Sequence, residues 1–294
     1  MLGSALENSM RREKSFDESI RGCERAFTRA DLVVLILAVS VLLVLQMPSL
    51  ANTRRNGNAS VCVAHLQQLS RAWRLYADDN SDRLVGNLDG GGVSTLSNSN
   101  KTWVLGWMDF SGGIPAGADT DTRYLAVYSP LAPYANRSAE IFKCPEDQSL
   151  SLGNRGAQRV RSVSMNGYLG ERASPFTPGY RQFKKITEMA TPGPARTWIF
   201  LDEREESIND GFFVVDMSGY PNNPNALRIV DFPAAYHASG AGVSFADGHA
   251  QIKTWLDPRT SPVLRPGQPL PLGGASPNNL DVLWLQERST SRIN

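Results

Sequence analysis

One long apolar run stands near the start of the chain, before a region of mixed polarity. Leu32 to Leu45 is a run of fourteen residues that is interrupted only by Ser40, and the run continues less purely to Leu50. Read from Leu32 to Leu50, it is long enough to cross a bilayer as a helix. The pattern therefore predicts a membrane helix that Pro48 kinks near its far end.

A second helical pattern follows a polar joint at residues 52–60. Its apolar residues recur at intervals of four, three, four and three, which is the spacing of one helix face. They are Cys62, Leu66, Leu69, Trp73 and Tyr76. We therefore expect residues 52–80 to continue the first helix as an amphipathic segment that packs on a globular domain.

The region 81–294 is dominated by short strand patterns and turn residues. A helix is expected near the end, and Asp247-Gly248 predicts a tight hairpin turn. A strand or hairpin arm is expected at 101–110, further strands at 160–169, 197–201, 211–215, 241–245 and 249–255, and the helix at 279–287. The fold class predicted is α+β, with a long N-terminal helix (a membrane half plus an amphipathic half) packed on a largely antiparallel sheet.

Charge and cysteine content narrow the possible functions. The net charge of +1 argues against a nucleic-acid partner, which would require a basic surface. Three cysteines are too few for a disulfide scaffold. Cys62 and Cys144 could form one disulfide in an exported protein, or they could remain as two buried free thiols.

The sequence offers two candidate metal sites, each with a simpler explanation. His237, Asp247 and His249 have side chains that bind divalent ions, but Asp247-Gly248 also makes the hairpin turn and each histidine could bond a nearby loop. A second set could hold calcium through oxygen ligands, although a solvated helix end explains it more simply. That set is Asp78, Asp79, Asn80 and Asp82.

Motifs for catalysis are missing from the sequence. Trp103 and Trp107 could form a platform for a sugar or a partner, or could belong to the core. Glu205 and Glu206 lie in a charged segment and suggest no acid–base couple. With no nucleophile elbow, zinc-protease motif or phosphate loop, we expect no enzyme activity and no cofactor.

The residues around Arg29 and Asp31, just before the apolar run, resemble a known export signal. Residues 26–34, AFTRADLVV, resemble the class III signal of type IV pilins and type II secretion pseudopilins, whose usual pattern is Gly-Phe-Thr-Leu-Ile-Glu-Leu. The resemblance implies that prepilin peptidase removes a leader, 1–26, by cutting between Ala26 and Phe27, and that Phe27 is then N-methylated. It also implies an assembly helix at 27–51, with Asp31 at the fifth mature position and Pro48 at the twenty-second.

The position of Asp31 has a physical rationale in such an assembly. A carboxylate beside an apolar helix is costly unless it has a partner. In a helical fibre, the carboxylate of one subunit can neutralise the terminal amine of its neighbour. Asp31 is therefore predicted to be a subunit-assembly contact.

The globular region resembles a pseudopilin-like family with a C-terminal His-x9-Asp-Gly motif. His237 precedes Asp247-Gly248 by the required spacing, and His249 follows directly. Three further segments resemble the same family, so the resemblance covers most of the chain. They are CVAHLQQLSRAWRLYADDN from Cys62, IFKCPED from Ile141 and VRSVSMNGYLG from Val160.

These resemblances imply a pseudopilin-like subunit of a type II secretion or type IV pilus-like fibre. Its expected partners are prepilin peptidase, other pseudopilin subunits and the inner membrane. The expected location is single-pass in the inner membrane, with a cytoplasmic N-terminus and a globular domain, 81–294, in the periplasm or outside the cell. The alternative is a membrane-anchored module that binds polysaccharide or protein, and an exported hydrolase is a third possibility.

Overall fold

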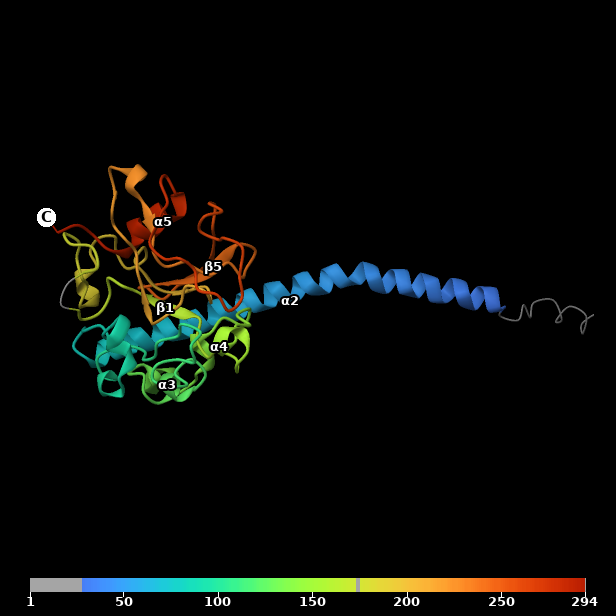
Figure 1. Cartoon of the computed structure of the whole chain (residues 1–294), viewed down its shortest axis with the longest axis horizontal. Coiled ribbons are helices and arrows are strands. Elements are labelled where there is room, and N and C mark those ends of the chain that lie inside the picture. Colours follow the sequence, from blue (N-terminus) through green and yellow to red (C-terminus); the bar gives the residue numbers. More distant parts are fainter. Residues whose placement is uncertain (1–27, 173–174, 294) are drawn as a thin grey trace, which may run out of the picture. The chain divides into compact units, whose positions relative to one another are not determined.

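The computed structural model describes residues 28–172 and 175–293, apart from the side chains of 42–56. The helices are α2 (Arg29–Asp79), α3 (Arg123–Ala126), α4 (Ser151–Asn154) and α5 (Leu280–Ser289) (Figure 1). Six 3-10 turns are η1 (Gly90–Ser94), η2 (Leu96–Asn98), η3 (Ala132–Ala135), η4 (Glu140–Phe142), η5 (Ile186–Glu188) and η6 (Pro224–Ala226). The strands are β1 (Val163–Asn166), β2 (Trp198–Asp202), β3 (Phe212–Phe213), β4 (Arg228–Ile229), β5 (Gly240–Phe245), β6 (Ala250–Thr254) and β7 (Gly274–Ala275).

The main sheet is mixed and has the strand order β3-β1-β2-β5-β6. β1 pairs antiparallel with β2 but parallel with β3, and the β2–β5 and β5–β6 pairs are antiparallel. Every residue of β1, β2, β3 and β5 is buried, whereas the edge strand β6 is partly exposed. The predicted hairpin at Asp247-Gly248 is confirmed by the pairing of Ser244 with Ala250.

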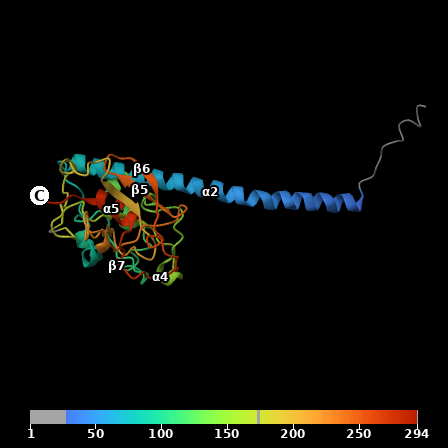
Figure 2. The same cartoon turned by 90° about the horizontal axis from the view of Figure 1, so that it is seen from above.

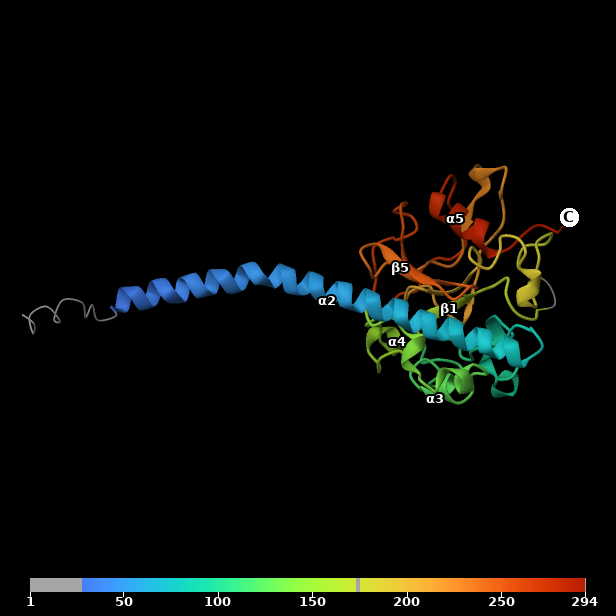
Figure 3. The same cartoon turned by 180° about the vertical axis from the view of Figure 1, so that it is seen from behind.

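The C-terminal part of α2 covers one face of this sheet. The stripe predicted from the sequence is buried there, with Tyr76 only partly so, and it shares a core with Val163, Met165 and Phe200. Residues of the α3 and α4 region lie on the far side of this helix segment (Figures 1 and 3). Figure 2 shows β5 and β6 beside the same segment from a second direction.

The opposite face of the sheet is covered by α5. Leu285 of α5 shares a second core with Trp198, Ala241 and Val243. The helix begins where the Asn279 side chain accepts hydrogen bonds from the backbone N–H groups of Asp281 and Val282, which is an N-cap. The helix predicted at 279–287 is thus confirmed.

The predicted fold class, a long N-terminal helix with a membrane half and an amphipathic half packed on a largely antiparallel sheet, is wrong, because no helix of the described residues is apolar enough over sufficient length to supply the membrane half. The chain divides into two compact units, Met1–Arg54 and Arg55–Asn294, so only the second part of α2 belongs with the sheet. The parallel β1–β3 pair also makes the sheet mixed. The fold class that the structure supports is α+β with a mixed sheet.

The predicted membrane span and inner-membrane location are also wrong. Within the described residues, no helix is both long and apolar enough to cross a membrane. The pure apolar run, Leu32 to Leu45, would extend about 21 Å at the helical rise, which is short of the ~30 Å hydrocarbon core. Beyond Leu45 the apolar pattern is interrupted by Gln46, Pro48 and Ser49.

Candidate functional site

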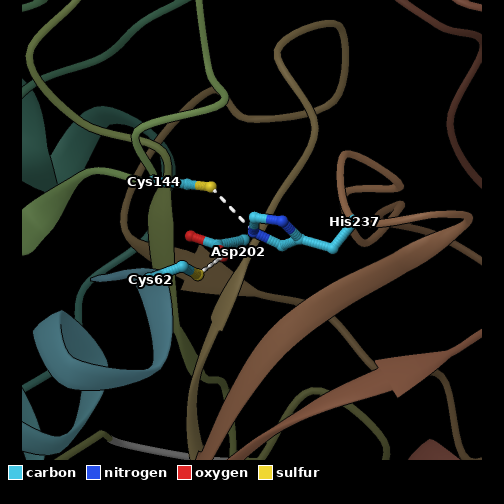
Figure 4. A group of neighbouring side chains, drawn as sticks. All are labelled: Cys62, Cys144, Asp202 and His237. Carbon is cyan, nitrogen blue, oxygen red and sulfur yellow. Dashed lines mark hydrogen bonds between the residues drawn. The ribbon is translucent and has the colours of Figure 1, made fainter. Parts of the chain in front are cut away.

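Four buried side chains from distant parts of the sequence meet beneath α2 (Figure 4). They are Cys62, Cys144, Asp202 and His237. One sulfur, nitrogen or oxygen atom from each lies within 4.8 Å of the corresponding atom of every other. The Cys62 Sγ atom donates to Asp202 Oδ2 at 2.7 Å, and Cys144 Sγ lies 3.2 Å from His237 Nε2.

Cys62 reaches the cluster because α2 approaches β5 closely at Gly242. A β-carbon on Gly242 would lie 2.6 Å from the sulfur of Cys62 and 2.9 Å from Asp202 Oδ2. It would also lie 2.5 Å from Leu66 on the next helical turn. A side chain at Gly242 would therefore separate the helix from the sheet and occupy the space of the cluster.

Cys144 lies in the loop that follows η4, and polar contacts hold this loop. The backbone N–H of Cys144 donates to Ser162 Oγ at 2.8 Å. Two residues of α2 hold the neighbouring loop positions, because Asn58 donates to Glu146 at 2.7 Å and a ring nitrogen of His65 lies 3.0 Å from the carbonyl oxygen of Lys143. The loop position is therefore fixed from both α2 and β1.

Asp202 ends β2, in the interior of the sheet, where its carboxylate is fully surrounded. Its Oδ1 accepts from Ser162 Oγ at 3.2 Å, and its Oδ2 accepts from the backbone N–H of Gly242 at 3.3 Å. Ser162 thus contacts both Asp202 and the backbone of Cys144. One hydroxyl therefore fixes the relative positions of two members of the cluster.

His237 is positioned by a tight turn that leads into β5. Its backbone exchanges both hydrogen bonds with Gly240, at 3.1 and 3.0 Å, around Ala238 and Ser239, which have φ values of 51° and 63°. Positive φ at both central positions is typical of the type I′ turn. The residue His237 is 8% exposed, and its ring atom Nδ1 is buried without a hydrogen-bond partner among the described residues.

Burial opposes charge on all four groups. The hydrogen bond between Cys62 and Cys144 raises the pKa of the Cys62 thiol, and burial raises it further. The same bond lowers the pKa of Cys144, but burial and the nearby Asp202 outweigh it and the net shift is upward. Burial raises the pKa of Asp202 to about 6 against three hydrogen bonds, and burial lowers the pKa of His237. Thiols and an imidazole are therefore present mainly as neutral groups.

The predicted motif residues separate into two places. His237 joins the buried cluster, whereas Asp247 and His249 lie at the exposed β5–β6 turn and contact each other at 2.6 Å. Gly248 has a φ of 99°, which suits its place in that turn. Within the described residues, the cluster around His237 contains neither Asp247 nor His249.

The two cysteines considered for a disulfide are present as buried free thiols. The sequence predicted that they could meet, but it gave no reason to include Asp202. The motif does single out His237, so the two signals together pointed to three of the four residues. Asp202 could have been suspected only as a charged residue that directly follows the apolar pattern WIFL.

The remaining candidates from the sequence have structural partners. Asp82 accepts from Thr187, and Asp79 accepts from Tyr134, so two carboxylates of the proposed calcium set are engaged in hydrogen bonds. Trp103 is fully buried, and Trp107 is partly buried. These placements agree with the simpler structural explanations of both sets.

The predicted assembly segment is described only from Thr28 onward. Ala26 and Phe27, the predicted cleavage and methylation site, lie outside the described residues, as does the side chain of Pro48. Asp31 forms a capping box with Thr28: its Oδ2 accepts from the Thr28 backbone N–H at 2.9 Å, and its own N–H donates to Thr28 Oγ1 at 3.2 Å. The hydrogen bonds that the Thr28 backbone N–H and hydroxyl donate to the carboxylate lower the pKa of Asp31.

Titration of a buried carboxyl should make stability depend on pH. Burial raises the pKa of Asp210 to about 6, although N–H groups of Gly90 and Phe212 and the Arg161 guanidinium lower it. Because the folded chain holds this proton more tightly than the unfolded chain, the contribution of Asp210 to stability is lost as pH rises. In Asp210→Asn, the oxygen acceptor stays and the ionisation is removed.

We expect the free energy of unfolding of the wild type, minus that of Asp210→Asn, to fall by roughly 3 kcal/mol between about pH 3 and pH 7. Urea denaturation at a series of pH values measures this difference. A difference that stays constant across the range would contradict the predicted role of Asp210.

No known protein family matches this chain, and neither the curated proteins nor the solved structures include a significant match.

Proposed function

We propose that this chain is a pseudopilin-like subunit that prepilin peptidase processes between Ala26 and Phe27. After processing, the first part of α2 assembles with the corresponding helices of other subunits in a type II secretion or type IV pilus-like fibre. The observation that carries this proposal is the exposed apolar surface at the start of α2. These exposed apolar side chains need other apolar groups to cover them, and a partner helix would provide that cover.

This surface surrounds the helix instead of forming one stripe. The large apolar side chains between Leu32 and Val41 are exposed, from 46% at Val39 to 65% at Val34. A helix that is apolar on all sides is stable only where other apolar groups cover it. Copies of the same helix provide a matching surface, and the carboxylate at its first turn can meet an amine there.

Asp31 supports this proposal because its capping role leaves part of the carboxylate unused. The Thr28 backbone N–H and hydroxyl both donate to Oδ2 of Asp31. Among the described residues, Oδ1 accepts no hydrogen bond. The carboxylate is fully exposed. It can therefore cap its own helix and pair with the terminal amine of a neighbouring subunit at the same time.

Two substitutions separate capping from assembly. Asp31→Asn keeps a side-chain oxygen that can accept the Thr28 bonds, but it removes the negative charge. Thr28→Ala removes the cap and leaves the charge. With prepilin peptidase co-expressed, we expect Asp31→Asn to reduce sedimentable fibre about tenfold or more, because the charge-assisted contact is lost at every interface. Thr28→Ala should assemble at close to the wild-type level.

Mass spectrometry of the mature N-terminus serves as the control for processing. We expect both variants to begin at an N-methylated Phe27, so that a loss of fibre reports on assembly alone. Full assembly by Asp31→Asn would reject the charge-pairing role. A wild-type chain that keeps Met1 in the presence of the peptidase would reject the proposed function itself.

A further inference from the structure

We propose that Cys62, Cys144, Asp202 and His237 form a structural Zn²⁺ site. This inference concerns the globular unit, Arg55–Asn294, and does not depend on the proposed assembly of the fibre. It rests on the type of the donor atoms, their mutual distances and their burial.

The donor atoms are those that zinc prefers. Two cysteine sulfurs and an imidazole nitrogen are relatively soft ligands, which favour Zn²⁺ over Mg²⁺ or Ca²⁺. A carboxylate oxygen completes the four-coordinate set that is usual for zinc. Three of the four residues are therefore of types that calcium or magnesium sites seldom use.

The spacing of the donors fits a single ion. Zinc bonds of about 2.0–2.3 Å place tetrahedral ligand atoms roughly 3.5 Å apart. The contacts of 2.7 Å for Cys62–Asp202 and 3.2 Å for Cys144–His237 fall below this value, and all four donor atoms lie within 4.8 Å of one another. Side-chain adjustments of less than about 1.5 Å would equalise these distances around one ion.

Binding replaces polar hydrogens by metal bonds. Each thiol loses its proton to solvent as its sulfur forms a bond to Zn²⁺. The sulfurs of Cys62 and Cys144 then each carry one negative charge. The dication then compensates buried negative charge that the protein alone disfavours. No change of oxidation state is involved.

Contacts around the four donors hold them in place. Ser162 Oγ donates to the far oxygen of Asp202 and accepts from the backbone of Cys144, so it orients two ligands. Gly242 contributes an N–H to Asp202 and leaves the space that a side chain would fill. Outer contacts of this kind are typical of metal sites and influence their affinity.

The site would be structural because it has no open position. All four donors come from the chain, and the residues are between 1% and 8% exposed, which leaves no place for a reactive water. The ion would join Cys62 of α2 to Asp202 of β2, which are 140 residues apart in the sequence. It would also join Cys144 in the loop after η4 to His237 in the turn before β5, which are 93 residues apart. It would thus connect four segments around the core.

Zinc content of the purified full-length chain tests the site directly. In a Cys23→Ser background, kept reduced and reconstituted with Zn²⁺ alone, we expect one tightly held zinc per chain by elemental analysis. The chelated protein should melt at a lower temperature, and zinc should protect both remaining thiols from alkylation. The absence of stoichiometric zinc from the reduced, folded chain would overturn the proposal, whether or not a Cys62–Cys144 disulfide forms under oxidising conditions.

Matched histidine variants locate the ion. His237→Gln should weaken zinc binding by more than about 100-fold, while His249→Gln, the same change at the exposed turn, should leave affinity unchanged. Ser162→Ala should weaken binding about 10- to 100-fold and retain the stoichiometry. Equal affinities in the two histidine variants would place the ion elsewhere and reject this site.

Co²⁺ provides a readout that does not depend on stability. When Co²⁺ replaces zinc, thiolate ligation should produce an intense near-ultraviolet charge-transfer band, and tetrahedral geometry should produce strong visible bands. Cys62→Ser should reduce the first, and Asp202→Asn should shift the second. A cobalt spectrum without a thiolate band in the folded wild type would contradict the proposed ligands.

Discussion

Replacing Arg161 with Met should lower the free energy of unfolding by about 3–5 kcal/mol. The Arg161 guanidinium is fully buried and donates to the backbone carbonyls of Val163 and Asp210, at 3.0 and 2.8 Å. It also lies near the buried carboxyls of Asp210 and Glu203. Methionine would fill much of the volume but would remove both of these hydrogen bonds, so that the Asp210 carbonyl keeps only a long bond from Ser164 Oγ at 3.4 Å. It would also leave the carboxyls without their cation.

Burial lowers the pKa of Arg161 to about 10, so the group is still charged at neutral pH. Arg161→Lys would keep the charge without the planar fork and should lie between the wild type and Arg161→Met. Arg155→Met changes an exposed arginine in the same region and should cost less than about 0.5 kcal/mol. Chemical denaturation measures all three, and equal effects at the two arginines would contradict the buried network.

Replacing Trp103 with Ala should also destabilise the fold by about 3–5 kcal/mol. The indole is fully buried, stacks on Phe142 at 5.9 Å between ring centroids, and lies 5.0 Å from Phe200. Its Nε1 donates to the carbonyl of Gly211 at 3.0 Å. The substitution therefore leaves a large cavity and removes one of the two hydrogen bonds to the Gly211 carbonyl, which keeps the bond from the Met165 backbone N–H.

Two further variants identify the source of this loss. Trp103→Phe would retain an aromatic ring but lose the bond to Gly211, so its effect should be smaller than that of alanine. Trp107→Ala removes the same side chain four positions later, where it is only partly buried, and should cost clearly less. If both alanine variants unfolded at the same urea concentration, the core role of Trp103 would be rejected.

Periodicity predicted the elements whose residues repeat with a regular spacing. The buried stripe from Cys62 to Trp73 follows the helical period, and the β5–β6 hairpin follows from Asp247-Gly248 between two alternating segments. The same spacing could not predict that β3 would pair parallel with β1 and make the sheet mixed. That pairing depends on contacts across the fold, which a local pattern does not contain.

Charged residues misled the sequence reasoning after β2. Residues 202–210, DEREESIND, read as a charged loop, yet all except Asn209 are buried. Glu206 forms a buried ion pair with Arg204, and burial raises the pKa of Glu205 to about 7. Composition predicts exposure for such a segment, and only the folded chain supplies the partners that make burial possible.

The buried cluster shows the same limit more sharply. Its members lie far apart in the sequence, so no local motif could place Asp202 beside Cys62. The strand pattern of 101–110 likewise failed, because within 101–110 the only β pairing is the isolated bridge between Trp107 and Ile114. Sites and strands that depend on long-range pairing require the three-dimensional fold.

The entry of α2 into the globular unit has a mechanical consequence. A pull on α2 where the globular unit begins, at Arg55, would pass along the helix toward Asp79. The first side-chain contacts that would resist this pull in the globular unit include the hydrogen bond from Asn58 to Glu146, followed by the bond from Cys62 to Asp202 in the cluster. A zinc ion there would share the tension among four segments, so the domain would resist extraction of its helix by a coordinate bond and not by packing alone.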